Sequence, residues 1–182
     1  MIAAITITGK DRPGIIAAVT EILYQAGCNL EDASMTVLEG EFAMICLAAV
    51  KAGKSSQPLQ ARLKQAEKRL HLTISVKPIQ HRLVRGRKHP SGTTSWLVSV
   101  LGKDRSGIVY HVSKTLAKHG LNITDLNSQI MGSGKKTAYA LMLEVDLPAR
   151  KTLLDPLRRE FNLLQKKLNV TITLNPVDSA QF

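Results

Sequence analysis

The sequence Gly9-Lys-Asp-Arg-Pro-Gly-Ile15 returns 93 positions later as Gly102-Lys-Asp-Arg-Ser-Gly-Ile108. The similarity extends beyond these seven residues, because 11 of the 26 positions in residues 9–34 are identical to their counterparts in residues 102–127. A repeat of this length is too long for a solenoid unit and is typical of a small domain. The sequence therefore predicts a tandem duplication.

Each copy predicts the same order of secondary-structure elements. Strands are predicted where apolar residues alternate or cluster, and helices where they recur at helical spacing. The predicted strands are 2–8, 29–38, 41–50 and 72–76 in the first copy and 95–101, 121–131, 136–145 and 170–174 in the second. A helix follows the first strand of each copy, and a second helix follows Pro58 or Pro156. The start of the last helix stays open, because Leu153 and Leu154 fit its apolar stripe but precede the proline.

The order βαββαβ, found twice, predicts an α+β protein of two ferredoxin-like domains. Each has an antiparallel four-stranded sheet with two helices on one face. The predicted boundaries are 1–79 for the first domain, 80–94 for a basic linker and 95–182 for the second domain.

Composition excludes several classes of protein. The chain of 182 residues is 44% hydrophobic and 21% charged, which favours a folded core over disorder. No apolar run approaches the roughly 20 residues that span a bilayer, and the first residues lack a secretory signal. Two cysteines, Cys28 and Cys46, are too few for a disulfide scaffold or a zinc site, so we expect them to pack in the interior. A soluble cytoplasmic protein is expected.

Positive charge is concentrated in the middle of the chain. Residues 51–90 hold eleven basic residues and one acidic residue, within a net charge of +11 for the whole chain. Such a segment is typical of a solvated linker or of contact with an anionic partner. The residues expected to make such a contact are Lys77, Arg82, Arg85, Arg87 and Lys88. An acidic protein partner is the favoured interpretation, because no aromatic residue for base stacking occurs in 77–93. Direct nucleic-acid binding through this 77–88 arm is the alternative.

The loop after the first strand of each copy is the candidate ligand site. Asp11-Arg-Pro-Gly14 and Asp104-Arg-Ser-Gly107 each place a glycine in the predicted first helical turn. Helix N-termini attract carboxylates and phosphates, and glycine lets a ligand approach the backbone. Across the same sheet edge, the second strand is expected to supply Asn and Asp oxygens that accept from an ammonium group. The combination fits a free α-amino acid; the alternative is that the glycine only starts the helix and Asn-x-x-Asp only shapes a loop.

Two βαββαβ units with Gly-x-Asp-Arg-Pro-Gly-Ile, and then Gly-Cys-Asn-Leu-Glu-Asp about a helix later, resemble ACT domains, which are regulatory modules that bind amino acids. A chain of two such domains, with these motifs in the first, resembles the family of glycine-cleavage-system transcriptional repressors. The resemblance covers nearly the whole chain. It implies a repressor that regulates glycine cleavage genes by contacting a DNA-bound activator, with glycine as the first candidate ligand and no cofactor.

The resemblance also implies which residues hold the ligand: the loop glycine, the polar residue three before it, and the asparagine that opens the second strand. The predicted ligand-binding residues are Asp11, Arg12, Gly14, Asn29 and Asp32 in the first copy and Asp104, Arg105, Gly107, Asn122 and Asp125 in the second. Serine-binding members have asparagine and histidine where this chain has Asp11 and Gly9. Ser106 and Thr124 replace a proline and a glutamate of the first copy, so the two sites need not be equivalent.

Catalysis is the weakest hypothesis. The sequence has no nucleophile elbow, no glycine-rich phosphate loop and no metal-spaced histidine pair, and its five histidines are expected to be solvated. No catalytic residue or metal ligand is predicted. Exposed sheet edges predict a homodimer, although the two internal copies could pair with each other instead. A dimerisation scaffold without ligand remains a further alternative.

Overall fold

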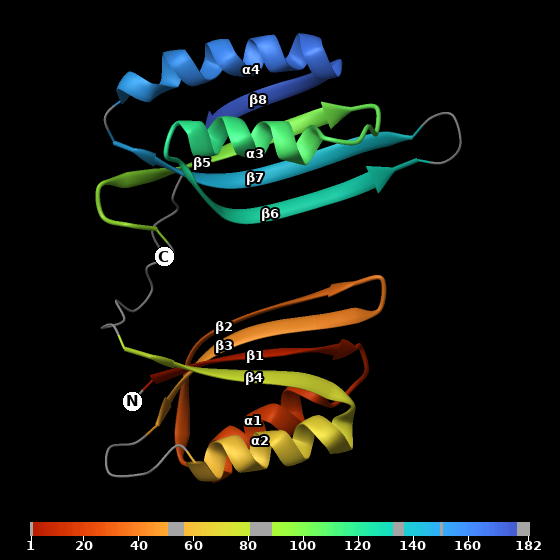
Figure 1. Ribbon diagram of the computed structural model, residues 1–182, viewed down its shortest axis with the longest axis vertical. Coiled ribbons are helices and arrows are strands. Elements are labelled where there is room, and N and C mark those ends of the chain that lie inside the picture. The colour runs from red at the N-terminus through yellow and green to blue at the C-terminus, as the bar shows by residue number, and fades with distance from the viewer. Residues whose placement is uncertain (1, 51–56, 81–88, 133–136, 150, 178–182) are drawn as a thin grey trace. The chain divides into compact units, whose positions relative to one another are not determined.

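The computed structural model describes residues 2–50, 57–80, 89–132, 137–149 and 151–177. The chain divides into two compact units, Met1–Gly86 and Arg87–Phe182. Each unit has one four-stranded antiparallel sheet with two helices covering one face, as Figure 1 shows. The predicted α+β class and the twofold βαββαβ order are therefore confirmed, while the predicted linker bounds stay a prediction.

The elements of the two units correspond one to one. The first unit contains β1 (Ile2–Lys10), α1 (Ile15–Gln25), β2 (Cys28–Leu38), β3 (Glu41–Val50), α2 (Gln57–Leu70) and β4 (Leu72–Ile79). The second contains β5 (Thr93–Gly102), α3 (Ile108–Lys118), β6 (Asn122–Met131), β7 (Ala138–Pro148), a short 3-10 helix (Lys151–Leu153), α4 (Leu154–Leu168) and β8 (Val170–Pro176). The strand orders are β2-β3-β1-β4 and β6-β7-β5-β8, so β2 and β6 lie at sheet edges.

Each unit has its own hydrophobic core between the sheet and its helices. Every second residue of β1 (Ala3, Ile5 and Ile7) is buried, and the same period holds in β7 from Leu141 to Leu147. The helical stripes predicted from the sequence supply the other half of each core. Trp96, the only tryptophan of the chain, packs against the second core and so reports on that unit alone.

The start of the last helix, which the sequence left open, lies before the proline. Residues 151–153 form a 3-10 turn and α4 begins at Leu154, so Pro156 is its third residue. The first four backbone N–H groups of a helix have no partner within the helix. The missing N–H of proline therefore costs no hydrogen bond at this position.

The basic arm is only partly within the described residues. Lys77 belongs to β4, where it pairs with Ala4 of β1, and its side chain is exposed. It is therefore part of a strand and does not belong to a free arm. Arg82, Arg85, Arg87 and Lys88 lie outside the described residues.

Two equivalent glycines allow strands to pack closely at the end of each sheet, and the second is the more constrained. A Cβ added to Gly102 would lie 3.0 Å from the Cα of Val170, which is backbone of β8. At Gly9 the shortest contact would be with the Cδ2 of Leu72, the end of a flexible side chain. We expect Gly102→Ala to lower the unfolding free energy of the second unit by about 2 kcal/mol, because overpacking forces backbone shifts. Urea denaturation followed by Trp96 fluorescence measures this.

Gly9→Ala is the matched control for that experiment. It should cost clearly less, about 1 kcal/mol or below, because Leu72 can move. Circular dichroism follows it, since the first unit has no tryptophan. Equal losses for the two variants would contradict the packing argument.

Candidate functional site

The loop glycines adopt a backbone conformation that only glycine adopts readily. Gly14 and Gly107 have φ of 94° and 91°, and each is the residue before the helix begins, not a residue of its first turn. The Gly14 carbonyl accepts from the Ala18 N–H at 2.9 Å. In the part of the chain that the structure describes, no side chain caps the first-turn N–H groups of α1 or α3. Apart from its chain neighbours, no described residue lies within 4 Å of a Cβ built on Gly14, so the approach to this terminus is open.

The second loop has a histidine side chain from α3 beside its glycine, and the first loop has none among the described residues. A Cβ built on Gly107 would lie 3.5 Å from Cδ2 of His111, one helical turn further along α3. The equivalent residue of the first unit is Ala18, which has no such group. His111 is therefore a candidate site residue that the sequence analysis treated as solvated, although its spacing of four from the glycine was visible.

A bulge at the start of the second strand brings the side chains with the predicted acceptor oxygens onto one face. Asn29 and Asp32 are three residues apart, which in a regular strand places two side chains on opposite faces. The pairing with β3 shifts between Leu30 and Asp32, so that Asn29 lies opposite Ala49 and Asp32 opposite Leu47. The second unit repeats this shift between Ile123 and Asp125. The Asn-x-x-Asp spacing therefore has a structural basis in both units.

The expectation that these oxygens lie across the same edge as the loop is wrong within one unit. Asn29 pairs with Ala49 of β3, whereas the loop follows Lys10, which pairs with Glu41. Eight residues of β3 separate these positions, or about 26 Å at the usual strand rise. The reason is topological: α1 returns the chain to the end of the sheet at which β1 begins. The second unit has the same arrangement, with Asn122 opposite Asp146 and the loop after Gly102.

Several predicted site residues already have partners in the protein. The guanidinium of Arg12 donates to the Leu70 carbonyl at 2.5 Å, at the last residue of α2. Asp32 accepts from the N–H of Ala33 at 2.9 Å, and Asn29 donates to Glu31 at 3.0 Å. The contact of Arg12 with Leu70 therefore places a positive charge at the negative C-terminal end of α2. The carboxylate of Asp125 accepts from Asn127 at 3.0 Å. Asp11, Asp104 and Arg105 are exposed.

Asn122 lines a cavity of about 410 Å³ between α3 and the start of β6. Tyr110, Ser113 and Lys114 of α3 form its polar wall. Lys114 donates to the hydroxyl of Tyr110 at 3.0 Å, and this hydrogen bond raises the pKa of Lys114. A cation and an amide therefore share one cavity at the sheet edge.

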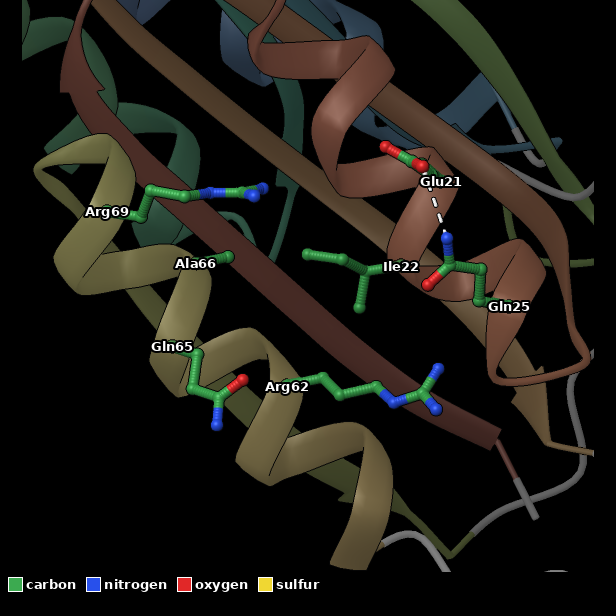
Figure 2. A pocket seen from close by; sticks show the side chains of 7 residues that line it. All are labelled: Glu21, Ile22, Gln25, Arg62, Gln65, Ala66 and Arg69. Atoms are coloured by element: carbon green, nitrogen blue, oxygen red, sulfur yellow. Dashed lines mark hydrogen bonds between the residues drawn. The ribbon is translucent and has the colours of Figure 1, made fainter.

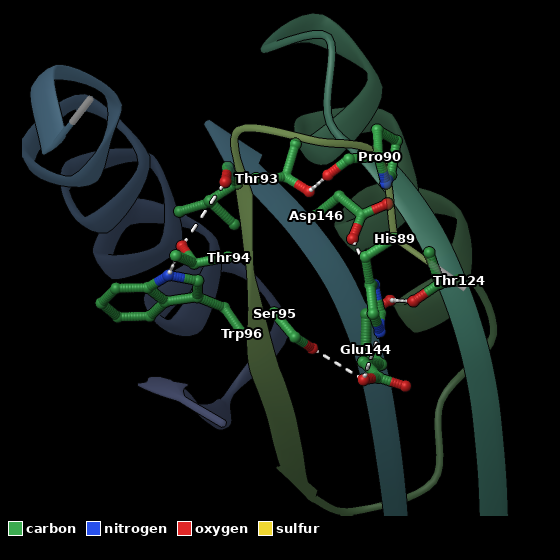
Figure 3. A network of polar contacts seen from close by, with 10 residues as sticks. His89, Pro90, Thr93, Thr94, Ser95, Trp96, Thr124, Glu144 and Asp146 are labelled. Carbon is green, nitrogen blue, oxygen red and sulfur yellow. Dashed lines mark hydrogen bonds and ion pairs between the residues drawn. The ribbon is translucent and has the colours of Figure 1, made fainter. Parts of the chain in front are cut away.

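The corner of the second sheet beside Asn122 contains a buried carboxylate, shown in Figure 3. Asp146 is 3% exposed and its Oδ1 lies 2.5 Å from Nδ1 of His89, while its buried Oδ2 has no hydrogen-bond partner among the described residues. Nε2 of His89 lies 3.4 Å from Glu144, which also accepts from the hydroxyl of Ser95 at 2.7 Å. The first unit has Leu47 and Ala49 at the equivalent positions, so among the described residues this network occurs in the second unit alone.

The expectation of solvated histidines is wrong for two of them. His89 contacts the buried Asp146, and the side chain of His119 is only 12% exposed, with Nε2 at 3.2 Å from Glu160. Glu160 also accepts from Lys118 at 2.8 Å, and this bond lowers the pKa of Glu160. Both histidines therefore fix one segment of the second unit to another.

Both cysteines lie in strands, where they were expected to pack in the interior and not to react. Cys46 is buried in the first core, which raises the pKa of its thiol, and Cys28 is partly buried. Neither forms a disulfide. Within the described ranges, no group of three or more His, Cys, Asp or Glu residues has the arrangement of a metal site. No described helix is long and apolar enough to cross a membrane.

Comparison with known proteins gives consistent matches over both units. The ACT domain family model matches residues 2–77 and 94–175. The glycine cleavage system transcriptional repressor of Escherichia coli K12 is 28% identical over 97% of this chain and 90% of that protein. A UPF0237 protein of Pyrobaculum aerophilum is 34% identical over 47% of this chain and 91% of its own length. A crystal structure of an unknown protein from Galdieria sulphuraria has a TM-score of 0.81 and 25% identity, covering 97% and 98% of the two chains.

Proposed function

Because this chain belongs to the ACT domain family, we propose that it is a non-catalytic regulatory protein that senses a small amino acid, with glycine as the first candidate. Its target is transcription of glycine cleavage genes, reached through contact with a DNA-bound activator protein. Two things support this proposal: the match to the E. coli repressor along almost the whole chain, and the tandem arrangement of two units with the same loop. The open helix terminus at Gly14 is the observation that carries it.

The ligand chemistry follows from the two halves of the site. The carboxylate of an amino acid is bound by first-turn N–H groups of α1, where the helix dipole favours negative charge. The ammonium group is bound by carboxylate and amide oxygens, of which Asp11 and Asp32 supply the charge. The Nδ2 of Asn29 donates to Glu31, so its amide oxygen is the atom available to accept.

The two halves meet only if a second unit completes the site. Loop and Asn29 lie at opposite ends of one sheet, and β2 is an edge strand. When two identical edge strands pair antiparallel, the start of one lies beside the end of the other. Antiparallel pairing of β2 from two copies of the chain therefore brings Asn29 of one copy to the loop of the other. We propose a homodimer on this ground, with two equivalent sites related by its twofold axis.

A small amino acid is expected to stabilise the protein against heat. A ligand present at a hundred times its dissociation constant adds about 2.7 kcal/mol to the native state, which raises the melting temperature by about 10 °C. A thermal-shift screen of the free amino acids, beginning with glycine, measures this. Asp11→Ala should remove most of the shift that arises from the first unit, and Asp104→Ala most of that from the second.

Glu41→Ala is the matched control for that screen. Glu41 is an exposed carboxylate at the same end of the sheet as the loop, opposite Lys10, but it is not in the proposed site. Its loss should leave the ligand-induced shift unchanged. If none of the amino acids raises the melting temperature, ligand sensing is excluded and a dimerisation scaffold takes its place.

A further inference from the structure

The groove between α1 and α2 of the first unit forms a cavity of about 340 Å³, within the usual size range of small-molecule sites. Figure 2 shows that the side chains of Arg62 and Arg69 extend from α2 across this groove toward α1. The buried side chains of Ile22 and Ala66 form its apolar floor. The remaining lining residues are Glu21, Gln25 and Gln65.

Within the described part of the chain, the two arginines of the groove are unpaired. Neither guanidinium has an ion-pair or hydrogen-bond partner among the residues that the structure describes. They are seven residues apart on α2, so about 10 Å separates their Cα atoms along one helix face. Arginine binds phosphate and carboxylate groups with two parallel hydrogen bonds, which gives such a pair selectivity for anions.

The second unit shows that this open groove is not a general consequence of the fold. The buried residues Leu63 and Phe161 occupy the same position of the second helix in the two units, so Glu160 is the counterpart of Arg62. Glu160 is paired across the helices with Lys118 at 2.8 Å, and Lys118 is the counterpart of Gln25. The same helix position therefore carries an ion pair between the helices in the second unit, and in the first unit a cation without a partner among the described residues.

We propose that this groove binds a small organic anion with phosphate or carboxylate groups, held by Arg62 and Arg69. The ligand also has hydroxyl or amino donors, because the carboxylate of Glu21 faces the same groove and can only accept. Glu21 already accepts from Gln25 at 3.1 Å, which holds it in place on α1. These residues belong to the second half of α1, whereas the proposed amino-acid site is at its first turn. The groove is thus a second, independent ligand site.

Calorimetric titration of the full chain with two probes tests this proposal. Fructose 1,6-bisphosphate has two phosphates and several hydroxyl groups, and citrate is the carboxylate probe. We expect at least one of them to bind with a dissociation constant below about 1 mM. The double variant Arg62→Gln and Arg69→Gln should weaken this binding at least tenfold, because it removes both charged donors but retains polar side chains.

The matched control removes the same charge from the same helix. Lys64 and Lys68 are exposed on α2 but do not line the groove, so Lys64→Gln with Lys68→Gln should leave binding within twofold of the parent chain. Binding of either probe that is lost only in the arginine variant supports the site. Failure of both probes to bind overturns it, and so does an equal loss in the two variants, because that result shows unspecific attraction to a basic helix. Glycine binding should be the same in all of these chains.

Discussion

Replacing His89 with alanine is expected to lower the unfolding free energy of the second unit by about 2–3 kcal/mol, because it leaves a buried carboxylate without its partner. Asp146 is 3% exposed, and its Oδ1 is hydrogen-bonded to the His89 imidazole. A loss of this size lowers the melting temperature of a unit of about 90 residues by about 10 °C. Trp96 fluorescence during chemical denaturation measures the effect, since this residue packs against the second core.

The double-mutant cycle with Asp146→Asn separates this contact from loss of packing. An amide at residue 146 has no charge to be left uncompensated, so removal of His89 from the Asp146→Asn chain should cost less than about 1 kcal/mol. Ser95→Ala is the control for the rest of the network, because the Ser95 hydroxyl donates to Glu144 and not to Asp146. If His89→Ala is equally costly with aspartate and with asparagine at residue 146, the buried charge is not the cause.

The contact of His89 with Asp146 fixes the segment that leads into the second unit. His89 precedes β5 by four residues and is fixed to β7, 57 residues later in the chain. The carbonyl of Pro90 accepts from Thr93 at 2.7 Å, and Ala149 donates to Gly92 at 2.9 Å. These contacts hold His89 and Gly92 to the second unit.

Much of the fold could be predicted from the sequence because its signals are local. The repeat at Gly9 and Gly102 gives the duplication, and apolar spacing gives each helix its buried face. The turn between β2 and β3 is two residues long, and both of them, Glu39 and Gly40, have positive φ. The bulges in β2 and β6 were not predicted, because no residue type marks them and pairing alone defines them.

The candidate site was harder to predict, because it depends on which end of the sheet each residue occupies. Residue types at Asp11, Gly14 and Asn29 suggest amino-acid chemistry, but the spacing in sequence does not say at which end each lies. A helix of 11 residues spans about 16 Å, enough to return the chain to the starting end. That length was visible in the sequence and could have placed Asn29 correctly. The contact of His89 with Asp146 was not visible, because the two residues are distant in sequence and pair only through the register of β5 and β7.

A mixture of two defective chains is expected to recover ligand binding that neither has alone. Each proposed site combines the loop of one copy with Asn29 of the other, so Asp11→Ala and Asn29→Ala each disable both sites of a homodimer. In a mixed dimer both defects fall in the same site, and the other site is intact. After the two variants are unfolded together and refolded, half of the dimers are mixed, and about a quarter of the parental sites should bind.

The measurement needs chains in which only the first unit binds. Asn122→Ala in every chain removes the sites of the second unit, and calorimetric stoichiometry with the amino acid found in the screen then counts those of the first. Both test residues are exposed, so the variants should retain the parental circular dichroism and melting temperature. Gly14→Val offers a second loop variant, although its φ of 94° adds strain of about 1–2 kcal/mol. A refolded mixture that binds no ligand, while the parent chain binds, would show that the site is completed within one chain and not across two copies.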